Sequence, residues 1–129
     1  MRVFKTKLFS RFARRADIGD EALREAIERA ERGLVDADLG EGIIKQRVAR
    51  PGEGKSGGFR TIIGYNARNR AVFLYGFAKN AQDNISPKDL AALRKLGATY
   101  LALGDDDLKV ALAEDELIEV PYGEERVPQ

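Results

Sequence analysis

Three basic side chains in the middle of the sequence have a spacing that suits phosphate chemistry. Lys45 and Arg47 are two residues apart in a segment with strand composition, so both should point to the same face of that strand. Arg60 follows a pair of glycines at the start of the next such segment. Cations that converge from adjacent strands can bind a phosphodiester backbone and stabilise negative charge that develops at phosphorus. A solvated outer face explains the same pattern equally well, because lysine and arginine are common on surfaces.

The elements that must position these cations form one stretch, residues 42–80. Residues 43–50 and 59–65 mix β-branched and charged residues, and residues 71–77 are almost wholly apolar and aromatic, which favours strands. A loop rich in glycine joins the first two segments, and residues 66–69 make a short turn between the last two. The stretch therefore predicts an antiparallel meander of three strands.

The predicted meander is strongly basic. It holds eight basic side chains and one acidic side chain, Glu53, a net charge of +7. The basic residues are Lys45, Arg47, Arg50, Lys55, Arg60, Arg68, Arg70 and Lys79. So large a charge on one small sheet predicts a polyanionic partner.

The composition of the whole chain excludes several classes of site. The chain has 129 residues, enough for one domain with its own core, and contains no cysteine and no histidine. Triads that use a histidine base, cysteine nucleophiles and zinc sites built from cysteine or histidine are therefore excluded. We expect no metal and no cofactor, so that any catalysis uses Lys, Arg, Tyr, Asp or Glu.

Hydropathy and cysteine usage bear on where the protein acts. No apolar run approaches the roughly 18 residues of a membrane span, and the basic N-terminus is interrupted by charges. The absence of cysteine fits a reducing compartment. We expect a soluble cytoplasmic protein without a membrane partner.

Hydrophobic periodicity and capping signals place the remaining elements around the meander. The pattern predicts a strand at 2–5, helices at 7–17 and 20–33, a connector at 34–41, a helix from the Ser86 cap to about 103, a helix at 105–113, a strand at 117–120 and a frayed end at 123–129. The predicted fold class is α+β, a small sandwich in which two N-terminal helices pack on one face of an antiparallel sheet and a further helix follows the meander. We expect the opposite face of the sheet to be open, with Lys45, Arg47 and Arg60 on it.

Charge divides the chain into a basic body and an acidic tail. Residues 1–104 carry +8 and residues 105–129 carry −7, which suggests a domain followed by an acidic extension. The tail could mask the basic sheet through diffuse attraction. Alternatively, residues 105–113 form a structural helix and residues 117–120 pair with a sheet edge.

Two further patterns have competing interpretations. Gly54-Lys55-Ser56 suggests a phosphate-binding loop, but that motif needs a glycine where Ala49 stands and a helix after the serine. The apolar run at 71–77 is typical of core, whereas Tyr65 and Tyr75 could each stack on a base or pack under a helix.

The segments KQRVARPGEGKSGGFRTIIGY and RAVFLYGFAKNAQDNIS resemble the RelE/HigB superfamily of toxins from bacterial type II toxin–antitoxin modules, and most closely the phage-associated, HigB-like branch. The resemblance covers roughly residues 1–103. It implies a RelE-like fold and a toxin that cleaves messenger RNA on the ribosome and inhibits translation. It also implies an antitoxin partner, of a type that usually carries a helix-turn-helix domain.

The resemblance also assigns roles to residues. It implies that Lys45, Arg47, Arg60 and Lys79 are catalytic, with the 2′-hydroxyl of the RNA attacking the adjacent phosphorus to leave a 2′,3′-cyclic phosphate. Predicted RNA-binding residues are Arg50, Lys55, Arg68, Arg70, Tyr65 and Asn80.

The chain departs from the family pattern at two positions. Some relatives have an arginine where Asn80 stands and a tyrosine acid or base near the position of Ser86. A lysine of lowered pKa, Lys45 or Lys79, could replace the tyrosine. The alternative hypothesis is a non-catalytic RNA-binding or antitoxin-binding module with the same fold.

Overall fold

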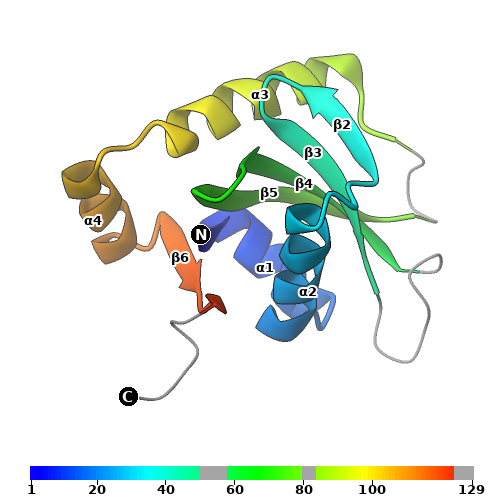
Figure 1. Ribbon diagram of the computed structural model, residues 1–129, viewed down its shortest axis with the longest axis horizontal. Helices are drawn as coiled ribbons and strands as arrows, with labels where there is room; N and C mark the ends of the chain where they lie inside the picture. The colour runs from blue at the N-terminus through cyan, green and yellow to red at the C-terminus, as the bar shows by residue number, and fades with distance from the viewer. Residues whose placement is uncertain (50–57, 80–83, 124–129) are drawn as a thin grey trace.

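The computed structural model describes residues 1–49, 58–79 and 84–123, which form a mixed sheet with helices on both sides (Figure 1). In chain order the elements are β1 (Arg2–Thr6), α1 (Lys7–Arg15), α2 (Asp20–Glu31), β2 (Ala37–Gly40), β3 (Ile43–Val48), β4 (Phe59–Asn66), β5 (Arg70–Ala78), α3 (Pro87–Leu101), α4 (Asp105–Ala113) and β6 (Leu117–Val120). The predicted α+β class is confirmed.

The sheet has six strands in the order β2-β3-β4-β5-β1-β6. The predicted meander is confirmed, because β3 pairs antiparallel with β4 and β4 pairs antiparallel with β5. The sheet is not wholly antiparallel, however, since β1 runs parallel to β5. Parallel strands need a long crossover connection, and here that connection contains α1, α2 and three strands.

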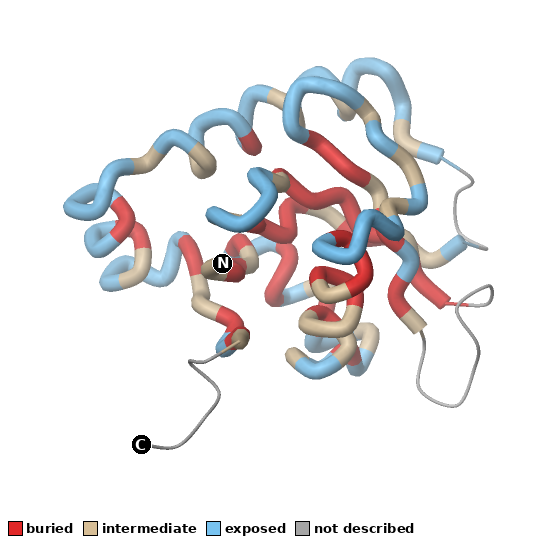
Figure 2. The backbone as a smooth tube through the Cα atoms, in the orientation of Figure 1, coloured by how far each residue is buried: buried red, intermediate tan, exposed pale blue. Residues whose placement is uncertain are grey.

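Helices cover both faces of the sheet. α1 and α2 pack on one face around Phe9, Leu23 and Ile27, in agreement with the prediction. The expectation of an open opposite face is wrong, because α3 and α4 cover it with Leu93, Leu101, Leu108 and other side chains. Most of the buried residues therefore lie in the middle of the molecule, between the helices and along the sheet (Figure 2).

The position of α3 depends on two glycines. A Cβ atom on Gly97 would lie 2.7 Å from Cδ1 of Ile43, and a Cβ atom on Gly64 would lie 3.5 Å from Cα of Gly97. The sequence marks Gly97 as a weak point in a helix. In the structure it is the one buried residue of α3, at the point where the helix backbone touches β4.

Part of the predicted connector at 34–41 is a strand. β2 pairs antiparallel with β3 at the edge of the sheet, and the turn between them has positive φ at Gly40, Glu41 and Gly42. The sequence gives little signal for β2, because its residues ADLG include an acid and a glycine and have no β-branched side chain.

The described part of the acidic tail belongs to the sheet. β6 pairs antiparallel with β1, and Leu117 and Val120 are buried in the two cores. Glu119 forms a bidentate contact with Arg2, at 2.8 and 2.9 Å. The structural alternative for residues 105–113 and 117–120 is therefore confirmed, and β6 lies beside β1 and not over the basic part of the meander.

We predict that Leu117→Ala lowers the free energy of unfolding by about 2–5 kcal/mol, because Leu117 is 1% exposed and its truncation leaves a cavity in the core. Val110→Ala is the matched control, since Val110 is 54% exposed on α4 and its truncation should change stability by about 0.5 kcal/mol or less. Urea unfolding of both variants gives the comparison. Equal stabilities would show that β6 is not an integral strand.

Candidate functional site

Strand pairing brings the three central cations together at one end of the sheet. Lys45 is opposite Ile62, and Ile62 is opposite Tyr75. In the next row Arg47 is opposite Arg60, and Arg60 is opposite Phe77. Ile62 and Phe77 belong to the core under α3, so alternation along each strand places the cations on that same face. The convergence of these three residues on one face agrees with the prediction from their spacing, although this face is covered by α3 over most of its length.

Arg60 is the most unusual of the three cations. Its side chain is half-buried, and its Nη1 atom is buried without a hydrogen-bond partner in the described part of the chain. A buried donor that makes no hydrogen bond costs about 1–3 kcal/mol, so such groups call for a physical explanation. A phosphate oxygen would satisfy this donor, and guanidinium groups bind phosphate through two parallel hydrogen bonds.

Arg47 is held in place by Asp36, which precedes β2. Oδ2 of Asp36 accepts a hydrogen bond from the backbone N–H of Arg47 at 2.6 Å, and Oδ1 accepts one from its guanidinium at 3.3 Å. One carboxylate thus fixes both the backbone and the side chain of Arg47. The side chain of Arg47 remains 44% exposed and can also reach a ligand.

Arg29 of α2 completes this brace from the other face of the sheet. Its buried guanidinium donates to the backbone carbonyl of Arg47 and pairs with Glu25 at 2.7 Å and with Asp36 at 3.6 Å. Burial alone would raise the pKa of Asp36, but the hydrogen bonds from Arg47 and the charges of Arg47 and Arg29 hold that pKa below its ordinary value. Asp36 is therefore an anion that organises two arginines.

The buried amide of Gln46 fixes β3 between Lys45 and Arg47. It donates to the carbonyl of Ala26 at 2.9 Å and to that of Leu34 at 3.3 Å, and its oxygen accepts from the backbone N–H of Asp36 at 2.7 Å. A fully buried amide is tolerated when its hydrogen bonds are made. Gln46 thereby links α2, the segment before β2 and the strand that carries the cations.

Lys79 and Tyr75 lie near the same end of the sheet. Lys79 is exposed directly after Ala78, which is opposite Phe59 at the start of β4. Tyr75 is half-buried and packs against the core under α3, with its ring 6.0 Å from that of Phe77. The sequence leaves Tyr75 open between base stacking and packing, and the structure favours packing.

Other predicted RNA-binding residues do not join this cluster. Tyr65, Arg68 and Arg70 lie at the opposite end of β4 and β5, because those strands are antiparallel. Arg50, Lys55 and Asn80 lie outside the described residues.

Arg70 has a structural contact that the sequence did not predict. Its Nη1 atom donates to the carbonyls of Tyr100 and Leu103, both at 2.9 Å, at the C-terminal end of α3. A cation that binds the last carbonyls of a helix also compensates the helix dipole. We therefore leave Arg70 out of the candidate site.

Tyr65 lies on the face covered by α2, opposite the face that carries the cations. Burial, with a smaller contribution from the charge of Glu31, raises the pKa of Tyr65. Glu31 also accepts a hydrogen bond from the hydroxyl of Tyr122 at 3.0 Å. These contacts indicate a packing role for Tyr65.

Ser86, near which the sequence resemblance places a tyrosine in some relatives, has a hydroxyl that caps a helix. Its Oγ accepts a hydrogen bond from the backbone N–H of Asp89 at 3.1 Å, and Pro87 follows at the first helical position. The predicted start signal of α3 is confirmed. The hydroxyl of Ser86 therefore supports the start of α3.

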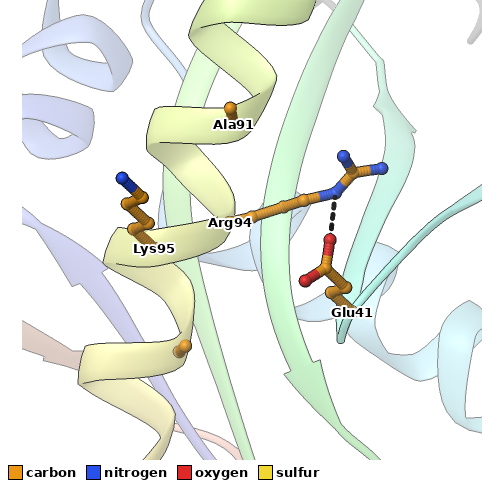
Figure 3. Close-up of a pocket in the computed structure, with 5 residues that line it drawn as sticks. Glu41, Ala91, Arg94 and Lys95 are labelled. Carbon is orange, nitrogen blue, oxygen red and sulfur yellow. Dashed lines mark ion pairs between the residues drawn. The ribbon is translucent and has the colours of Figure 1, made fainter.

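A hollow of about 310 Å³ lies between α3 and the turn that joins β2 to β3 (Figure 3). Nε of Arg94 forms an ion pair with Glu41 at 3.3 Å, although the two groups are not aligned for a hydrogen bond. Another nitrogen of the Arg94 guanidinium donates a hydrogen bond to the backbone carbonyl of Leu39. Lys95 points away from this pair (Figure 3). The charged groups of the hollow thus attach α3 to the edge of the sheet.

Two searches of the described residues address other kinds of site. Within residues 1–49, 58–79 and 84–123, no group of three or more His, Cys, Asp or Glu side chains is placed to hold a metal ion. In the same part of the chain, no helix has the length and hydropathy needed to span a membrane.

The described residues thus make a small α+β protein with a cluster of cations at one end of its sheet. Residues 1–120 match the sequence model of the family described as the RelE toxin of the RelE / RelB toxin-antitoxin system, so the chain belongs to the RelE toxin family. It is the toxin of such a system, and its partner is an antitoxin. No curated protein matches the chain. The matched region therefore includes α4 and β6, whereas the sequence resemblance was expected to end near residue 103.

Asp36→Asn should weaken the brace around Arg47 in a pH-dependent way. The lowered pKa of Asp36 means that its stabilisation is fully present above about pH 4 and is lost as pH falls through the folded-state value. At pH 7 we expect a loss of about 1–3 kcal/mol, since hydrogen bonds to charged groups are removed. The difference in melting temperature between wild type and Asp36→Asn should become smaller as the pH falls from 7 to 2.5.

The matched control is Asp17→Asn, which removes the same charge from an exposed position whose positive φ also suits asparagine. It should leave the melting temperature almost unchanged at every pH. A difference between wild type and Asp36→Asn that stays constant with pH would contradict the assigned role of Asp36.

Proposed function

We propose that this toxin is a ribosome-dependent endoribonuclease that cuts messenger RNA and inhibits translation. The observation that carries the proposal is the guanidinium of Arg60, which has a buried Nη1 without a partner among the described residues and lies directly across the strand pair from Arg47. Like charges on directly opposed strand positions destabilise a sheet. An RNA phosphate between the two arginines would relieve that repulsion. RelE-family toxins are generally ribonucleases, which supports the proposal that this toxin cuts RNA.

The proposed reaction uses groups of the RNA itself. The ribose 2′-oxygen loses its proton and forms a bond to the adjacent phosphorus, the bond from phosphorus to the 5′-oxygen breaks, and that oxygen takes up a proton. The products are a 2′,3′-cyclic phosphate and a 5′-hydroxyl. Arg60 and Arg47 would stabilise the extra negative charge on the phosphoryl oxygens in the transition state.

The lysines have the remaining roles in this proposal. Lys45 lies one row from Arg60 on the same face, and Lys79 lies at the same end of the sheet, so both can contact the RNA backbone. A lysine is also a candidate for proton transfer, because Ser86 is engaged as a cap. Arg50, Lys55 and Asn80 stay in the proposal as RNA-binding residues on the basis of their charge or sequence position.

Dependence on the ribosome is a further part of the proposal. Described residues other than Lys45, Arg47 and Arg60 line the hollows beside α1, beside α3 and next to Tyr65. A cluster of cations binds an RNA backbone through its charge, but charge alone does not align the 2′-oxygen for attack. Holding the reacting groups in line can supply much of a rate enhancement, and a ribosome-bound message would be held in this way.

The second candidate function is a non-catalytic module that binds RNA or the antitoxin. The observation in its favour is that the hydroxyl oxygen of Ser86 caps α3, near the place where the resemblance puts a tyrosine in some relatives.

Membership in the HigB-like branch, a helix-turn-helix antitoxin and action in the cytoplasm are further parts of the proposal, supported by the sequence resemblance.

Induced expression of the full chain separates the two candidates. We expect growth arrest and cuts within translated messages, mapped by sequencing of RNA 5′ ends, with no cuts in the same messages when their start codons are removed. Growth arrest with intact messages would favour the non-catalytic module and exclude the nuclease.

Replacement of Arg60 tests the proposed site directly. Arg60→Ala should reduce message cleavage by at least about 100-fold, in line with the loss of one group that stabilises transition-state charge. Arg60→Lys should restore only a small part, because lysine binds phosphate as a point charge. The matched control, Arg68→Ala at the opposite end of β4, should change cleavage less than about threefold. Full cleavage by Arg60→Ala would remove this residue from the site.

A further inference from the structure

The outward face of α1 is basic and forms no ion pair with any residue that the structure describes. Lys7, Arg11, Arg14 and Arg15 are all exposed, and none pairs with a carboxylate in the part of the chain that the structure describes. α2 differs, because there Arg29 pairs with Glu25.

Taken together, these four cations do not stabilise α1. The first turn of α1 contains no acidic residue and includes Lys7, whose charge opposes the helix dipole at that end. Arg14 and Arg15 in the last turn are favourable for the dipole, but Arg11 in the middle gains nothing from it. Four close cations without a counterion repel one another, so a function outside the fold is the better explanation.

A row of side chains that begins with two apolar residues lies beside the basic face of α1 and joins it at Arg15. Leu8, Phe12 and Arg15 follow one another at a spacing of one helical turn, and Leu8 is 63% exposed, the highest value for a large apolar side chain in the described residues. The row lines a hollow of about 190 Å³ against Tyr75 and Gly76 of β5. β1 pairs with β5 only as far as Phe73, so this hollow lies where β1 has ended and β5 continues.

A second hollow extends the same surface. It has a volume of about 370 Å³ and is lined by Phe12, Arg15, Ala16 and Phe59. Phe12 and Arg15 line both hollows, so the two are adjacent along α1. Phe12 itself is fixed, because its ring lies 5.6 Å from Phe59 in an edge-to-face contact and covers Gly76. The surface is therefore preformed, with apolar hollows on one side and four cations on the other.

The chemistry of this surface selects its occupant. Carboxylates would complement the cations, and an apolar side chain between them would bury Leu8 and fill the hollow beside it. RNA would gain from the cations but not from an exposed leucine. A helix of nine residues with one strongly exposed apolar side chain also buries too little area to hold a membrane surface.

We propose that α1 is a docking surface for an acidic, amphipathic segment of the antitoxin, which places an apolar side chain against Leu8 and Phe12 and carboxylates against Arg11 and its neighbours. The proposal rests on the toxin–antitoxin pairing and is independent of the nuclease chemistry, because α1 packs on the face of the sheet opposite the cluster and neither hollow beside α1 is lined by Lys45, Arg47 or Arg60. The antitoxin would therefore bind without occupying that cluster.

The test measures the binding of the cognate antitoxin to the full-length toxin by calorimetry. The α1 variants are Leu8→Ser and Arg11→Glu. The matched controls are Val110→Ser, which removes an apolar side chain that is 54% exposed on α4, and Arg32→Glu, which reverses an exposed charge after α2. We expect each α1 variant to weaken binding at least about 30-fold and each control less than threefold, with unchanged melting temperature and message cleavage in all four.

A charge swap identifies the contact as one with carboxylates. An antitoxin variant with one glutamate of its acidic segment changed to lysine should bind Arg11→Glu at least about tenfold more tightly than it binds wild type. Equal binding of the α1 variants and the controls overturns the proposal, as does a loss of single-stranded RNA or anionic-vesicle binding in the α1 variants while antitoxin binding is kept. An antitoxin that fails to bind the wild type also overturns it, whereas continued message cleavage in that case leaves the nuclease proposal standing.

Discussion

The contact between Gly97 of α3 and Gly64 of β4 determines how much of the sheet is available for function. Neither glycine has a side chain, so the helix backbone lies directly on the strand, and a Cβ atom on Gly97 would lie 2.7 Å from Ile43 and 3.3 Å from Leu74. Close packing of this kind leaves no room for a ligand between helix and sheet. The face that carries Lys45, Arg47 and Arg60 is therefore closed along most of its length, and only its end can meet a polyanion.

This constraint explains the contacts of the arginines. Arg70 is on β5 at the end where α3 terminates, and its guanidinium binds the carbonyls of the last helical turn. Arg47 and Arg60 lie at the other end, where Asp36 holds the first and no described group satisfies Nη1 of the second. The two ends of the basic sheet thus differ. At one end Arg70 binds the end of α3, and at the other end Arg47 and Arg60 can still contact a ligand.

The sequence predicts the elements of this fold better than it predicts their contacts. The meander, both N-terminal helices, the Ser86 cap and β6 are all visible in periodicity and capping signals, because these depend on neighbouring residues. The placement of Lys45, Arg47 and Arg60 on one face follows from a spacing of two and from the antiparallel pairing of the predicted meander. Asp36, Arg29 and Gln46 were not identified as a network, because their contacts cross from α2 to β3 and no local pattern encodes them. β2 and the covered second face were missed for the same reason.

The positions of the charged side chains, and not the net charge of the chain, indicate which surfaces can bind an anion. The acidic tail and the basic body nearly cancel in number, yet several described acids of the tail interact locally: Glu119 binds Arg2, and three aspartates occupy the first turn of α4, where they complement the dipole. The cations of α1 have no such partners among the described residues. No described carboxylate of α4 or β6 forms an ion pair with the cations of α1 or with Arg60, and these two groups of cations are separated from each other by the sheet. Two positive surfaces on opposite faces can each take a different anionic partner, one of them nucleic acid and the other protein.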